Sequence, residues 1–99
     1  MKLTSKQKKY LKGEAHHLPV LVQVGKNGCS ELLINQLAAS LADHELVKVR
    51  VTAEDQAEFK TLVDQIADKV EGILIHTIGH TAIFFKQNVK ETRFALPAG

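Results

Sequence analysis

The segment Gly25-Lys26-Asn27-Gly28 joins two glycines and a lysine at a spacing that suits contact with phosphate. Glycine permits positive φ and carries no side chain, so a phosphodiester can approach the backbone closely. Lys26 adds a mobile positive charge, and the amides of Gly28, Cys29 and Ser30 would lie at the positive end of a following helix. The spacing predicts a turn that holds a sugar-phosphate backbone. A tight turn without any ligand is the alternative interpretation.

Other basic side chains are expected to extend this contact. Basic residues outnumber acidic ones in the first half of the chain, and acidic residues outnumber basic ones in the second half. Such asymmetry is typical of a protein with one positive face. The residues expected on the same side as the turn are Lys6, Lys9, Lys12, Lys48 and Arg50. KH domains use a similar Gly-x-x-Gly clamp on single-stranded nucleic acid, so the pattern favours RNA as the partner.

Other kinds of site are disfavoured by what the sequence lacks. A Walker A loop or a dinucleotide fingerprint would need further glycines at other spacings. The five histidines include no pair at i, i+4 spacing on a predicted helix, as zinc enzymes have, because His76 and His80 lie in the predicted hairpin, and no base is evident beside Cys29. Phe84 and Phe85 must point to opposite faces of a strand, so one of them belongs to the core, and stacking of the other on a base is the less favoured alternative. We therefore expect no enzyme activity, no metal and no cofactor.

The turn is positioned by a strand before it and a helix after it. Residues 5–15 form a first helix with a capping box at Thr4 and Gln7, and residues 20–24 form a short buried strand after Pro19. Ser30 caps a second helix over residues 31–42, whose apolar stripe faces the core. Residues 46–51 alternate strictly, which places Lys48 and Arg50 together on one face of a strand.

The second half of the chain contributes one helix and a hairpin. Residues 55–71 form a third helix, with a capping box at Asp55 and Glu58 and with Gly72 as its left-handed stop. Residues 73–78 and 81–86 form antiparallel strands around Gly79-His80, a pair typical of a type II′ turn.

These elements predict a single α/β domain of order α-β-α-β-α-β-β, with a four-stranded mixed sheet and helices chiefly on one face. Residues 1–86 form the domain, and residues 87–99 are expected to be a loosely attached tail. The sequence contains neither a long apolar run nor an apolar leader, and one cysteine excludes an internal disulfide. A cytoplasmic monomer that binds neither membrane nor small-molecule substrate is the expectation.

The chain resembles the CRM domain, the chloroplast RNA splicing and ribosome maturation module, in its stand-alone bacterial YhbY form. The resemblance spans about residues 3–86 and rests on Leu11-Lys12-Gly13-Glu14-Ala15-His16, Val24-Gly25-Lys26-Asn27-Gly28, His44-Glu45-Leu46-Val47-Lys48-Val49-Arg50 and Ile78-Gly79-His80-Thr81. It implies a fold like the C-terminal domain of bacterial translation initiation factor three. It also implies binding to precursor large-subunit ribosomal RNA during ribosome assembly, with the turn at residues 25–28 as the RNA contact.

Two other functions remain open at this point. A protein-interaction module could dock on a ribosomal protein or an assembly factor through the acidic third helix or an exposed hairpin edge. A small enzyme is the other alternative, for which the sequence offers no pairing of nucleophile and base.

Overall fold

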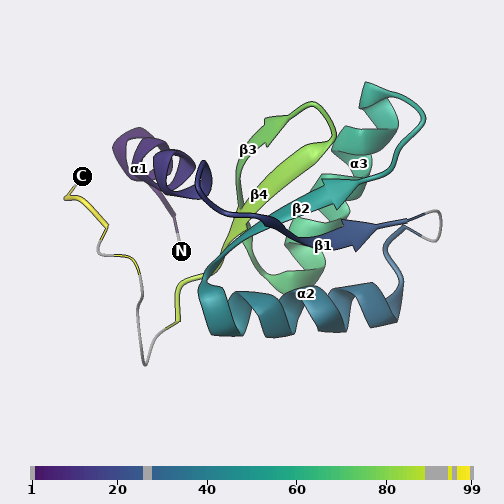
Figure 1. The fold of residues 1–99 in the computed structure, drawn as a ribbon, viewed down its shortest axis with the longest axis horizontal. Coiled ribbons are helices and arrows are strands. Elements are labelled where there is room, and N and C mark those ends of the chain that lie inside the picture. The colour runs from purple at the N-terminus through teal and green to yellow at the C-terminus, as the bar shows by residue number, and fades with distance from the viewer. Residues whose placement is uncertain (1, 26–27, 89–93, 95, 99) are drawn as a thin grey trace.

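The computed structural model describes residues 2–25, 28–88, 94 and 96–98. Its elements are α1 (Ser5–Ala15), β1 (Val20–Val24), α2 (Glu31–His44), β2 (Leu46–Val51), α3 (Gln56–Val70), β3 (Ile73–Ile78) and β4 (Thr81–Phe85). The predicted α/β class and order of elements are confirmed (Figure 1). Within the described part of the chain, no helix has the length and apolar character needed to cross a membrane.

The helices begin where side-chain caps satisfy their first amides. The Gln7 N–H donates to Thr4 Oγ1 at 3.1 Å and the Thr4 N–H donates to Gln7 Oε1 at 3.0 Å, which confirms the first capping box. The second predicted box is only half formed. Asp55 Oδ1 accepts from the Glu58 N–H at 2.8 Å, but the Glu58 carboxylate accepts from Glu54 at 3.0 Å instead of from Asp55.

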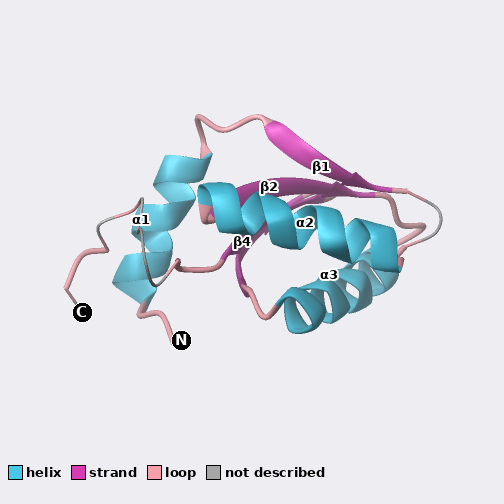
Figure 2. Ribbon diagram, turned by 90° about the horizontal axis from the view of Figure 1, so that it is seen from below, coloured by secondary structure: helices cyan, strands magenta, loops and turns pink. Residues whose placement is uncertain are grey.

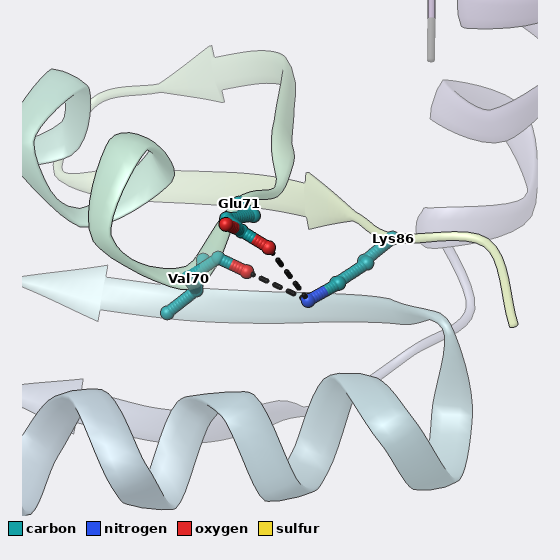
Figure 3. A network of polar contacts seen from close by, with 3 residues as sticks. All are labelled: Val70, Glu71 and Lys86. Carbon is teal, nitrogen blue, oxygen red and sulfur yellow. Dashed lines mark hydrogen bonds and ion pairs between the residues drawn. The ribbon is translucent and has the colours of Figure 1, made fainter.

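The end of α3 differs from the prediction. Glu71, and not Gly72, takes the left-handed conformation, with φ 56°. Gly72 has no positive φ, and a Cβ there would lie 3.2 Å from Val70 Cγ2, a tight contact that Val70 would have to relieve. Lys86 Nζ donates to the Val70 carbonyl at 3.1 Å and lies 3.9 Å from Glu71 Oε2 (Figure 3). Lys86 therefore closes the C-terminus of α3, where a positive charge is favourable.

The sheet has the strand order β1-β2-β4-β3. β1 and β2 are parallel, whereas β4 runs antiparallel to both β2 and β3. The predicted mixed sheet is thus confirmed. Gly79 has φ 58° at the β3–β4 turn while His80 has no positive φ, as a type II′ turn requires.

The sheet separates two apolar clusters. α2 and α3 lie along one face, over a large cluster that includes Val49, Val63 and Phe84 (Figure 2). α1 packs on one end of the opposite face, over a smaller cluster that includes Leu11 and Phe85. Phe84 and Phe85 point to opposite faces as predicted, but each is 0% exposed, so neither can stack on a base. Base stacking, the less favoured alternative, is thereby excluded.

β1 is an edge strand, so the prediction of a buried strand holds for only two of its five residues. Val22 and Val24 are buried, but Val20 is 38% and Leu21 is 45% exposed. The pairing of β1 with β2 is irregular between Val20 and Val22, where Leu21 has no partner. α2 also runs to His44, two residues beyond the prediction.

The described residues near the C-terminus contact the domain, contrary to the expectation of a loose tail. Phe94 and Leu96 pack against the smaller cluster, and the rings of Phe94 and Phe85 meet edge to face with centroids 6.4 Å apart. The Gln7 side-chain amide donates to the Pro97 carbonyl at 3.0 Å. The described residues of the tail are therefore held against α1, and they bury apolar surface of the smaller cluster that α1 does not cover.

Candidate nucleic-acid interface

The turn between β1 and α2 has a defined geometry on both sides of its tip. The Gly28 N–H donates to the Gly25 carbonyl at 3.0 Å, which closes a four-residue turn. The Ser30 N–H then donates to the Gly28 carbonyl at 3.0 Å, and Ser30 Oγ caps α2 by accepting from the Leu33 N–H at 3.2 Å. Lys26 and Asn27, which were predicted as site residues, lie outside the described residues.

The fold requires glycine at one end of this turn and not at the other. Gly28 has φ 59°, and a Cβ built on it would lie 3.4 Å from Leu62 Cδ2. Gly25 has no positive φ, and a Cβ built on it would meet no described atom within 4 Å. A tight turn without a ligand therefore explains Gly28 but leaves Gly25 unexplained.

Two of the three amides predicted to face phosphate are already engaged. The N–H groups of Gly28 and Ser30 donate to backbone carbonyls inside the turn. The Cys29 N–H has no such partner among the residues that the structure describes. The Cys29 N–H and the amides of Glu31 and Leu32 at the start of α2 are thus the donors left for an anion, at the positive end of the helix dipole.

Two hollows flank the turn, and their linings differ in charge. One, of about 230 Å³, is lined by Gly25, Gly28 and the uncharged side chains of Gln23, Ser30, Leu32, Leu33 and Gln36. The other, of about 610 Å³, adds Glu54 and Glu58 to its lining. An anionic backbone would be repelled by the two carboxylates, so the α2 side of the turn is the side open to phosphate.

The register of the sheet brings Arg50 to the turn. Arg50 pairs with Gln23, two residues before Gly25, and its side chain is exposed. Lys48 lies two residues further back along β2 on the same face, about 7 Å away at the usual rise of a strand. Its Nζ donates to the Leu18 carbonyl at 3.3 Å. The predicted basic face of β2 is therefore present, with Arg50 nearest the turn.

The lysines of α1 are not beside the turn. α1 covers the same face of the sheet that carries Lys48 and Arg50, but it lies at the opposite end of the molecule from the β1–α2 connection (Figure 1). Lys6 and Lys9 are exposed there, and Lys12 is half-buried. The α1 lysines therefore lie over the predicted sheet face, the one that carries Lys48 and Arg50. The prediction that they lie near the turn is wrong, because α1 is at the other end of that face.

Two histidines that sequence reasoning set aside lie next to Lys12. His16 is the C-cap of α1, and His76 lies in β3 on the face that α1 covers. The pKa of His76 is lowered, first by burial and then by the nearby positive charges of Lys12 and His16. The spacing of these residues in the sequence could not predict this group, because β3 lies beneath α1 only as a result of the strand order in the folded sheet.

Side chains suited to metal binding do not gather in the described part of the chain, where no three His, Cys, Asp or Glu residues lie together. Cys29 is half-buried and packs against the larger cluster. On α1, the pKa of Tyr10 is raised by burial and by the Glu14 carboxylate. The interface is therefore described by its turn, its basic strand face and the group around His76.

Comparison with known proteins identifies the family. A family model of the CRS1 / YhbY (CRM) domain matches residues 3–86. The "Probable RNA-binding protein YqeI" of Bacillus subtilis is 34% identical over 95 residues, which cover 96% of this chain and 99% of that protein. An "RNA-binding protein" of Haemophilus influenzae is also 34% identical over 95 residues, with 96% and 95% covered.

A solved structure agrees with these matches. The solution structure of the Staphylococcus aureus protein SAV1595 superposes with a TM-score of 0.85 at 30% identity, covering 97% of this chain and 100% of that one. The sequence similarity to these relatives extends over almost their whole length. The fold shared with the Staphylococcus aureus protein does so as well. The chain belongs to the CRS1 / YhbY (CRM) domain family.

Proposed function

We propose that this protein binds RNA through the turn at residues 25–28 and the basic face of β2, and that it associates with precursor large-subunit ribosomal RNA during ribosome assembly. Support comes from the family, whose matched members in Bacillus subtilis and Haemophilus influenzae are named RNA-binding proteins. No catalytic step is part of the proposal.

The observation that carries the proposal is the bare backbone at Gly25. The fold leaves space for a side chain there and imposes no left-handed conformation. A residue without a side chain is useful at such a position when another molecule must come close to the backbone. The adjacent N-terminus of α2 supplies amide donors and a positive dipole end, which suit a phosphodiester.

Charge determines how the RNA would lie. The hollow on the α2 side of the turn is lined by uncharged side chains, whereas Glu54 and Glu58 line the other hollow. Arg50 lies at the same end of the sheet, on its open face. The backbone of a bound RNA would therefore pass the turn on the α2 side and reach Arg50, and then Lys48, across β1. Contacts of this kind position RNA without reading its sequence.

The salt dependence of binding tests the proposal. RNA affinity should fall as salt rises, and each phosphate contact removed should lower the slope of log K against log salt by roughly 0.7–0.9. The Lys48→Gln, Arg50→Gln double variant should lower that slope by about 1.4–1.8. The matched control is Lys60→Gln, Lys69→Gln on exposed positions of α3, which should leave it unchanged. Binding without salt dependence, or equal slopes in all three proteins, would contradict the proposal.

Docking on a protein is the second candidate, and exposed apolar side chains on the edge strands favour it. Val20 and Leu21 on β1 are partly exposed, and Ile78 on β3 is 52% exposed. An open strand edge can pair with another chain. Nuclease treatment separates the candidates: association with pre-ribosomal particles should be lost after RNA digestion if RNA is the partner, and should survive if a protein is.

A further inference from the structure

A group of positive and titratable side chains lies where α1 meets β3, at the end of the sheet face remote from the turn. His76 pairs with Ile83, and Ile83 packs against Leu11 and Ala15 of α1, so His76 is on the face that α1 covers. Lys12 and His16 follow Leu11 and Ala15 by one residue each. They therefore form the next stripe around the helix, at its border with the sheet.

Among the described residues, no acidic side chain balances this group. The four strands contain no Asp or Glu at all. On α1 the one carboxylate is Glu14, which interacts with the Tyr10 hydroxyl. Among the residues that the structure describes, Lys12, His16 and His76 have no ion pair and no side-chain hydrogen bond. Like charges that lie together without a counter-charge are favourable only when an anion joins them.

The same face continues toward the turn as a basic track. Lys48 is in the same cross-strand row as His76, with Ile83 between them, which places the two roughly 10 Å apart at the usual strand spacing. Arg50 lies in the next row, toward the turn. Between α1 and the turn, the residues of the strands on this exposed face therefore have basic or uncharged side chains in the part of the chain that the structure describes.

We propose that His16, His76 and Lys12 form an anion site that takes a phosphate group of bound RNA, so that the RNA crosses the open sheet face from the turn to α1. The inference rests on the proposed function and adds a second contact to it. The site also makes RNA affinity depend on pH, because histidine changes its charge between pH 5 and 8 whereas lysine and arginine do not.

The sign of the pH effect follows from the neighbours of His76. In the free protein, burial and the charges of Lys12 and His16 lower the pKa of His76. The other groups on this face near His76 are Lys48 on β2 and the uncharged Ile83 on β4. A bound phosphodiester adds a negative charge that titrates only in strong acid, and it raises the pKa of both histidines. Binding therefore takes up protons, and RNA affinity rises as the pH falls through the histidine range.

The test is RNA affinity as a function of pH at constant ionic strength, with a single-stranded RNA and the full chain. A rise of one unit in the pKa of one histidine gives about a fivefold gain in affinity between pH 7.5 and pH 5.5. The His16→Gln, His76→Gln double variant should lose most of that gain. The control is His44→Gln, at the exposed C-terminal end of α2 on the other side of the sheet, which should keep the gain.

A pH dependence that is absent, or that survives in the double variant, would overturn the inference while leaving the proposed function standing. His16→Gln alone, at an exposed position, provides a second variant should the change at His76 disturb β3. It should lose part of the gain.

A second readout needs no RNA. Sulfate keeps its charge over this pH range, so its effect on the histidine ring resonances reports anion binding alone. Sulfate should raise the NMR-measured pKa of His16 and His76 and leave that of His44 unchanged. This arm keeps the inference testable if RNA does not bind at all, an outcome that would end the proposed function. Equal shifts at all three histidines would mean general screening and would overturn the anion site.

Discussion

Substituting the two glycines of the turn one at a time separates the needs of the fold from the needs of RNA binding. In Gly25→Ala, the added methyl group meets no described atom within 4 Å and the backbone has no positive φ. We expect stability to stay the same or to rise by about 0.4–1 kcal/mol, because alanine reduces the freedom of the unfolded chain. In Gly28→Ala, φ of 59° should cost about 1–2 kcal/mol, whereas the contact with Leu62 at 3.4 Å is ordinary and adds little.

RNA affinity should respond at Gly25 even though stability does not. A methyl group that keeps a phosphate from one charged hydrogen bond costs about 1.5–3 kcal/mol, which is roughly a 10-fold to 150-fold loss of affinity. The assays are urea unfolding followed by circular dichroism, and fluorescence anisotropy with a fragment of large-subunit precursor RNA. A stable Gly25→Ala variant with unchanged RNA affinity would refute the inference that Gly25 is kept bare for a ligand. A Gly25→Ala variant that is less stable would refute the conclusion that the fold has room for a methyl group at Gly25.

Three further predictions concern stability. Phe94→Ala should lower the free energy of unfolding in urea by about 1–2 kcal/mol, because the ring packs on Phe85 and covers the smaller cluster. An unchanged urea midpoint would mean that Phe94 does not contribute to the packing of the smaller cluster. Thr4→Ala should cost about 0.5–2 kcal/mol through loss of the capping box, and hydrogen exchange should show it first in α1. Because the folded-state pKa of His76 is lowered, the unfolded chain binds more protons below about pH 6.5, and stability should decline as the pH falls through that value. His76→Gln should flatten this part of the profile, and a stability that rises on acidification through this range would contradict the sign.

Local signals in the sequence predicted the elements well. Thr4 with Gln7 marks the first residue of α1, and Ser30 marks the start of α2, because a cap depends only on neighbours within one turn. The alternation in residues 46–51 correctly places Lys48 and Arg50 on the face away from α2 and α3, since the strand period depends on the backbone alone.

What the sequence could not provide depends on contacts between distant segments. The exposure of Val20 and Leu21 follows from the position of β1 at the sheet edge, which is decided by strand order. The nearness of His16 to His76 has the same origin. The strand order, with β4 between β2 and β3, is what places β3 beneath α1. The docking of Phe94 could not be foreseen either, since a single aromatic residue in a polar tail has no periodicity.

Crosslinking the protein to RNA in living cells, followed by sequencing of the attached fragments, tests the proposed function most directly. We expect the fragments to concentrate on precursor large-subunit ribosomal RNA, and the number recovered to fall sharply for Gly25→Ala. Fragments spread in proportion to total cellular RNA, or recovered equally with Gly25→Ala, would contradict a specific RNA partner held at this turn.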